Sequence, residues 1–132
     1  MRIEYLLTEK IGKWYFYSEE YFSTPHYFEE SLEAFIKREG WDNIPPVPVF
    51  ELPAGFPHQY VLMDGHSRHE IARRMNQKLK CAIYQKDEPI DIIRDGLADF
   101  GMRNEGIKKD YYDSILRLYI ESNNLDIKPK LT

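Results

Sequence analysis

The sequence predicts an α+β fold, in which a small mixed β-sheet with a crossover helix is followed by C-terminal helices. Residues 47–84 have the pattern strand, loop, strand, helix and strand within about 40 residues, which favours a compact sheet with a helical connection. Residues 90–123 instead carry apolar side chains at helical spacing. We therefore expect a sheet domain over residues 1–88 and a helical appendage over residues 89–132, packed on that domain.

Composition excludes several classes of protein. The chain has 132 residues, a net charge of −4 and one cysteine, so an internal disulfide and a cysteine metal cluster are both excluded. No apolar segment approaches the roughly 18 residues of a membrane span. The first residues carry charges where a signal peptide would be apolar, which predicts a cytoplasmic protein without a membrane partner. The acidic balance argues against a surface that binds nucleic acid everywhere.

Two elements are expected before the central sheet. The segments "RIEYLL" and "KWYFYS" flank "TEKIG", in which Gly12 can form a turn, and this pattern predicts a β-hairpin. A helix is expected from about Phe28 to Arg38, with Gly40 as its stop. Its apolar residues recur at helical spacing: Phe28, Leu32, Phe35 and Ile36.

The central segment predicts three short strands and one helix. Its prolines exclude a central strand over "PPVP", so "VPVFEL" is expected to be a short strand with Pro48 at an edge or at a non-donating position. "QYVLM" and "LKCAIY" are the other strands. Between them, "SRHEIARRMNQ" is expected to be a helix with Ile71, Ala72 and Met75 on its inner face.

The last third predicts two helices separated by Gly101 and Gly106. Apolar residues that would share one face of the first helix are Ile90, Ile93, Leu97 and Phe100. Those that would share one face of the second are Ile107, Tyr111, Ile115 and Leu118, with Tyr119 as a further candidate.

The stretch "YVLMDGHSRHEIARRM" admits two interpretations. In the first, Ser67 and Glu70 form a capping box, in which each side chain accepts the other residue's backbone N–H. In the second, the helix N-terminus binds an anion, because its backbone N–H groups point outward and Gly65 permits close approach. His66, Ser67 and Arg68 would add side-chain donors to such a site. The two interpretations are compatible.

Metal sites follow from the same stretch. A carboxylate such as Asp64 beside a phosphate requires a cation, and Mg²⁺ commonly sits between the two. Three imidazoles, those of His58, His66 and His69, offer a zinc alternative, although no HExxH motif or cysteine pair supports it.

Basic residues are concentrated between His66 and Lys80, where Glu70 is the single acid. They form either a solvated helix face or an anion-binding patch. The cations are Arg68, Arg73, Arg74, Lys78 and Lys80.

The residues from about Ser23 to Tyr84 resemble the ParB/sulfiredoxin superfamily. The resemblance lies in "TPHYFEESLEAFIKREGW", a proline-containing loop and helix, and in "IPPVPVFELPAGFPHQYVLMDGHSRHEIARRMNQKLKCAIY". It implies a Gly-x-x-Arg turn that binds nucleotide phosphates at a helix N-terminus, here Gly65 to Arg68. His69 and His26, which stands where an arginine is common in the proline loop, complete the implied binding residues.

Three branches of the superfamily differ in function. Sulfiredoxins carry a reactive cysteine directly after the glycine, where this chain has His66, so that activity is not expected. Partition proteins bind CTP and DNA, and usually carry Gly-Glu-Arg-Arg in place of "GHSR". The turn is similar to that of free serine kinases, Asp-Gly-His-His-Arg, and differs from it at Ser67. Phosphoryl transfer would then use Asp64 with Mg²⁺ and a carboxylate such as Glu29 or Glu30.

The expected function is therefore the binding of ATP, ADP or CTP with Mg²⁺, with phosphate hydrolysis or transfer to a small molecule as a further step. One alternative is a DNA-binding partition or regulatory module of plasmid or phage type, which would use the basic run from Arg68 to Lys80. Another is a non-catalytic protein-interaction domain. Fold resemblance does not choose among these functions.

Overall fold

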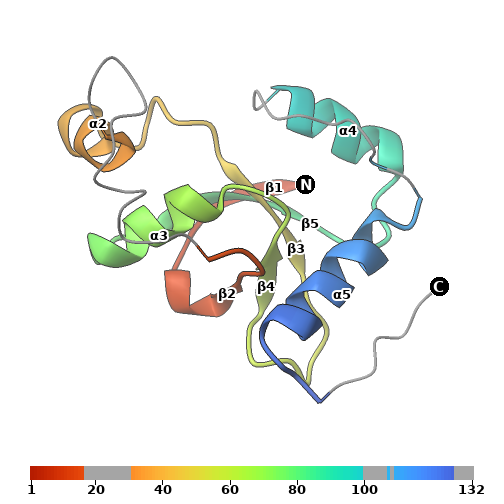
Figure 1. The fold of residues 1–132 in the computed structure, drawn as a ribbon. Helices are drawn as coiled ribbons and strands as arrows, with labels where there is room; N and C mark the ends of the chain where they lie inside the picture. Colours follow the sequence, from red (N-terminus) through yellow and green to blue (C-terminus); the bar gives the residue numbers. More distant parts are fainter. Residues whose placement is uncertain (17–30, 100–106, 108, 127–132) are drawn as a thin grey trace.

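The computed structural model describes residues 1–16, 31–99, 107 and 109–126. Within them the chain forms one five-stranded mixed sheet, in the order β1-β5-β3-β4-β2, with helices on it (Figure 1). The α+β class predicted from the sequence is confirmed. The elements are β1 (Arg2–Leu6), the 3₁₀ helix η1 (Thr8–Lys10), β2 (Ile11–Gly12), α2 (Leu32–Glu39), β3 (Val47–Glu51), β4 (Tyr60–Leu62), α3 (His66–Arg74), β5 (Leu79–Tyr84), α4 (Ile90–Asp99) and α5 (Tyr111–Ser122).

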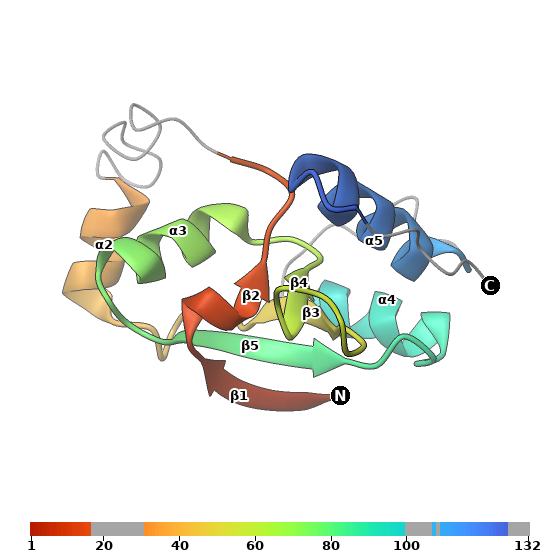
Figure 2. The ribbon, with the colours of Figure 1, turned by 90° about the horizontal axis from the view of Figure 1, so that it is seen from below.

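Helices cover both faces of the sheet. Figures 1 and 2 place α2 and α3 on one side and α4 and α5 on the other. Alternate strand residues such as Phe50 and Tyr84 pack with α4 and α5, whereas their neighbours Val49 and Ile83 share a cluster with Ala72 of α3. Burial on both faces explains why "VPVFE" and "LKCAIY" are apolar runs rather than alternating sequences.

The central strand is β3, which is parallel to β5 and antiparallel to β4. α3 connects β4 to β5 and is the predicted crossover helix. The edge position considered for Pro48 is wrong, since Pro48 lies within this central strand. Its carbonyl accepts the N–H of Met63 at 3.0 Å. The N–H and the carbonyl of a strand residue point towards the same neighbouring strand. For Pro48 this neighbour is a residue just beyond the end of β4, so the absence of an N–H removes little of the hydrogen-bond ladder.

The predicted N-terminal hairpin is wrong. β1 pairs antiparallel with β5 at one edge of the sheet, and β2 pairs parallel with β4 at the other edge. η1 links the two strands in place of a hairpin turn (Figure 2). Lys13–Phe16 form no strand, and residues 17 and 18 lie outside the described part of the chain. Pairing with distant strands therefore replaces the local pairing that the sequence pattern suggested.

The predicted helix before the sheet is confirmed as α2. Ser31 is its N-cap and accepts the N–H of Ala34 at 3.1 Å. Gly40 ends it with φ 77°, as the sequence predicted. The predicted start at Phe28 is wrong for this helix, because α2 begins at Leu32, directly after the extended N-cap Ser31; Phe28 itself lies outside the described residues. In α3, Ile71 and Ala72 are buried and Met75 packs beside Ile71, as expected for its inner face.

The two C-terminal helices are confirmed, but the predicted face of α5 is partly wrong. Leu118 is exposed, because the buried stripe of α5 runs through Ile115, Leu116, Tyr119 and Ile120. Phe100, Gly101 and Gly106 lie outside the described residues. A Cβ at Gly12 would lie 2.3 Å from Cε1 of Tyr119, so this glycine allows α5 to approach β2 closely. Whether residues 89–132 form a separate unit stays a prediction.

None of the helices in the described residues has the length and the apolar content needed to cross a membrane.

Candidate functional site

The turn before α3 has a conformation that favours glycine. Gly65 is the N-cap of α3, with φ 83° and ψ 28°, which is the left-handed region. A Cβ at this position would lie 2.7 Å from Cγ1 of Val47, the first residue of β3. Both the backbone angle and the close packing therefore exclude a larger side chain.

The predicted capping box is wrong. α3 begins at His66, so Ser67 lies inside its first turn, and no side chain caps the helix. Glu70 does not reach back to Ser67 and instead pairs with Lys13 and Arg73. The reason is that the left-handed conformation of Gly65 starts the helix two residues before the position that a Ser67 cap would require. The backbone N–H of His69 donates to the carbonyl oxygen of the N-cap residue, Gly65, at 3.0 Å.

Asp64 lies beside this turn with an exposed side chain. Its Oδ1 accepts the N–H of Gly65 at 2.8 Å, so a carboxylate already stands at the helix N-terminus. Within the described residues, no three histidine, cysteine or acidic side chains gather as a metal site. His58, His66 and His69 therefore do not form the zinc site considered from the sequence.

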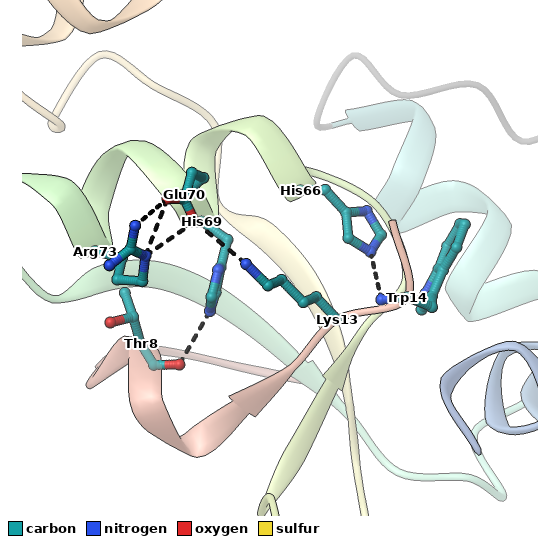
Figure 3. A network of polar contacts seen from close by, with 7 residues as sticks. All are labelled: Thr8, Lys13, Trp14, His66, His69, Glu70 and Arg73. Atoms are coloured by element: carbon teal, nitrogen blue, oxygen red, sulfur yellow. Dashed lines mark hydrogen bonds and ion pairs between the residues drawn. The ribbon is translucent and has the colours of Figure 1, made fainter. Parts of the chain in front are cut away.

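His66 faces the N-terminal segment (Figure 3). The backbone N–H of Trp14 donates to its Nε2 at 3.2 Å, and the Trp14 ring meets the imidazole edge-on with 4.4 Å between centroids. Burial, and secondarily the neighbouring His69 and Lys13, lower the pKa of His66 to about 4. Since Nε2 accepts a hydrogen bond, the neutral ring carries its proton on Nδ1. His66 thus links the start of α3 to the chain that follows β2.

His69 makes a second link from α3 to the N-terminal segment. Its Nε2 lies 3.0 Å from the carbonyl oxygen of Thr8, so this nitrogen donates. Burial lowers the pKa of His69 and favours the neutral ring. The buried Nδ1 has no hydrogen-bond partner among the described residues.

Glu70 is the centre of an ion-pair group on the same face of α3 (Figure 3). Lys13 Nζ lies 3.2 Å from its Oε2, and the Arg73 guanidinium donates to both of its oxygens. Hydrogen bonds from Arg73 and Lys13 lower the pKa of Glu70 to about 2, against the opposing effect of burial. A pocket of about 160 Å³ lies beside this group, lined by Lys13, Tyr15, Phe16, His66, Glu70 and Arg73.

Sequence reasoning missed this ion-pair group. Its signal was present in α3, because His66, His69, Glu70 and Arg73 are spaced i, i+3, i+4 and i+7 and so share one face of a helix. Lys13 carried no comparable signal, because the position of β2 beside β4 is not visible from the local pattern.

The structure separates Arg68 from the histidines of the turn. Arg68 Nη1 donates to the carbonyl oxygen of Pro45 at 2.8 Å, in the segment that leads into β3. Arg73 is about 140° from Arg68 around the helix and pairs with Glu70. Arg68 and Arg73 thus lie on different sides of α3, and DNA binding through the basic run stays a prediction that no observation favours. His26, Glu29 and Glu30 lie outside the described residues.

No protein-family model matches the chain, and neither does any curated protein. The resemblance to the ParB/sulfiredoxin superfamily therefore rests on the motif and its order along the chain.

Proposed function

We propose that the protein binds a phosphate-bearing small molecule, a nucleotide such as ATP, ADP or CTP, at the N-terminus of α3. The observation that carries the proposal is the Gly65 turn, which opens α3 in the left-handed conformation without a side-chain cap. The positive end of the helix dipole and the N–H groups of its first turn lie at this point, and both favour an anion.

The surrounding residues support the same ligand. Arg68 lies in the first turn of α3, and a guanidinium binds phosphate oxygens through two N–H groups. Phosphate binding would move this guanidinium from the Pro45 carbonyl, to which it donates in this structure, to the helix N-terminus. Asp64 would repel a phosphate, since its carboxylate lies at the turn. A Mg²⁺ ion between this carboxylate and the phosphate would remove the repulsion, so Mg²⁺ belongs to the proposal.

The order of the elements also supports the finer assignment to the ParB/sulfiredoxin fold. A proline-led strand, a short strand that is followed by Asp64 and Gly65, a crossover helix and a further strand come in the order β3, β4, α3 and β5. The assignment is part of the same proposal. Among the predicted catalytic carboxylates, Asp64 lies at the turn, where a phosphate would be transferred or hydrolysed.

Calorimetry of the full chain with ATP, ADP and CTP in the presence of Mg²⁺ tests the proposal. We expect binding of at least one nucleotide, and a loss of roughly tenfold or more in affinity for Arg68→Ala. Ser67→Glu should abolish binding while it preserves the fold, because an acid in the first turn stabilises a helix but repels an anion.

Lys78→Ala is the matched control, since it removes an exposed cation of the same basic run outside α3. Its affinity should equal that of the unmodified chain. The proposal fails if no nucleotide binds at millimolar concentration, or if Ser67→Glu binds as well as the parent. Phosphate release and serine phosphorylation, measured with the nucleotide that binds, then separate an enzyme from a binding protein.

A further inference from the structure

β1 is an edge strand with an apolar side. It ends the strand order of the sheet, and no described element lies on its outer side (Figure 2). Large apolar side chains recur at every second position and are exposed: Met1 (52%), Ile3 (44%), Tyr5 (48%) and Leu7 (41%). Successive strand residues alternate between faces, so Ile3 and Tyr5 of β1 lie on one face, and Met1 and Leu7 continue the same spacing directly beyond the two ends of the strand.

Proteins usually protect such an edge with charged side chains, proline, bulges or inward-pointing charges. Of these, β1 carries only exposed charges, and they are the oppositely charged Arg2 and Glu4. β1 has no proline, and its pairing with β5 is regular from Arg2 opposite Ile83 to Leu6 opposite Leu79. Its outer edge therefore presents extended backbone to another strand.

The charges of β1 indicate what that strand is. Arg2 and Glu4 lie on the other face of the strand, both exposed, with 2.8 Å between Nε and Oε2. They are placed symmetrically about Ile3. If two β1 strands pair antiparallel about Ile3, each Arg2 lies opposite the Glu4 of the other copy, and Ile3 lies opposite Ile3. Opposite charges and large apolar residues in facing positions stabilise an antiparallel pair.

We propose that β1 is a self-association edge, which pairs antiparallel with β1 of a second copy about Ile3 and joins the two sheets into one. The contact is isologous and closed, which is the commonest symmetry of soluble oligomers. A parallel arrangement would place Arg2 beside Arg2 and is disfavoured. The inference is independent of the nucleotide site, because β1 lies away from the Gly65 turn, on the opposite edge from β2.

Sedimentation equilibrium of the full chain, from about 10 µM to 1 mM, measures the association, a range suited to a small interface. We expect a concentration-dependent dimer. Arg2→Glu and Glu4→Arg should each weaken it roughly tenfold or more, because each puts two pairs of like charges opposite each other. An equimolar mixture of the two variants should dimerise again, since every pair is then complementary, and so should the double variant R2E/E4R.

Asp126→Arg, which makes the same charge change as Glu4→Arg at an exposed residue outside the sheet, is the control and should leave the dimer unchanged. Circular dichroism of each variant verifies the fold. A parent chain that stays monomeric at 1 mM would refute the proposal. Single variants that dimerise as well as the parent, or a mixture that does not regain association, would refute the register about Ile3.

Discussion

At the scale of single residues, Gly65 is a position where one added carbon atom meets two separate obstacles. Its positive φ disfavours any L side chain, and Val47 occupies the space that a Cβ would need. The first effect costs about 1–2 kcal/mol, and a forced contact in a packed region costs a further 1–3 kcal/mol, as a rough guide. The turn at which we propose that the anion binds is therefore also a position that tolerates only glycine at little cost in stability.

Gly65→Ala should lower the free energy of unfolding by about 3 kcal/mol, measured by urea denaturation. Gly55→Ala is the matched control, because Gly55 also has a positive φ of 102° but has no atom within 4 Å of an added Cβ. It should lose only the backbone contribution, about 1–2 kcal/mol. Equal losses in the two variants would contradict the packing contact with Val47.

The sequence predicted the tight turn at Gly65, but it misassigned Ser67 and Glu70. A serine followed three residues later by a glutamate is the signature of a capping box, and local rules cannot tell that a preceding glycine starts the helix earlier. The ion pair of Lys13 could not be predicted for a similar reason. Its partner Glu70 is distant in the sequence, and their meeting depends on the whole sheet.

At the scale of elements, α2 and α3 begin in different ways. α2 has a serine cap, in which the hydroxyl of Ser31 accepts the N–H of Ala34. α3 has a glycine in its place, and its serine lies one step inside the helix. The two serines therefore allow a comparison within one molecule.

Ser31→Ala should destabilise the protein by about 1 kcal/mol, the usual contribution of a side-chain N-cap. Ser67→Ala should change the free energy of unfolding by less than about 0.5 kcal/mol, since alanine suits a helix interior and no cap is lost. Thermal or urea unfolding followed at 222 nm measures both. A large loss of stability for Ser67→Ala would indicate that Ser67 caps α3 in solution.

Helices and strands with strong local patterns were predictable from the sequence, whereas the strand pairings were not. β3, β4 and β5 follow apolar runs bounded by prolines or turn residues, and α2 has its cap and its glycine stop in the sequence. The hairpin prediction failed because β1 and β2 fit two distant strands better than they fit each other. The prediction that Leu118 lies on the buried face of α5 failed because the spacing of apolar residues fixes a helical face only to within about one residue.

At the scale of the whole molecule, buried histidines make stability depend on pH. His66 has a folded pKa of about 4, and burial also lowers the pKa values of His69 and His58 below the ordinary value of 6.5. Below pH 6.5 the unfolded chain takes up protons that the folded chain does not, so protonation favours unfolding. The stability due to neutral His66 is thus complete above pH 6.5 and is lost as the pH falls towards 4.

Urea unfolding at pH 7.5, 6, 5 and 4 should therefore give a free energy of unfolding that falls steadily below about pH 6.5. His66→Gln, which does not titrate, should show a shallower fall between pH 6.5 and 4. Glu70 acts at lower pH, because its depressed pKa means that its contribution is lost between about 4.5 and 2. A pH profile with the same slope in the parent and in His66→Gln would exclude His66 as the titrating group.

The placement of the N-terminal segment has a kinetic consequence. Residues 2–12 supply both outer strands, yet β1 needs β5 and β2 needs β4 as partners. On the ribosome these residues emerge first, and β1 has no strand to join until Tyr84 has also left the exit tunnel. Contacts between residues so far apart slow folding, and they keep unpaired strands exposed for longer. β1 and β2 are synthesised first, and we therefore expect them to be among the last strands to join the sheet.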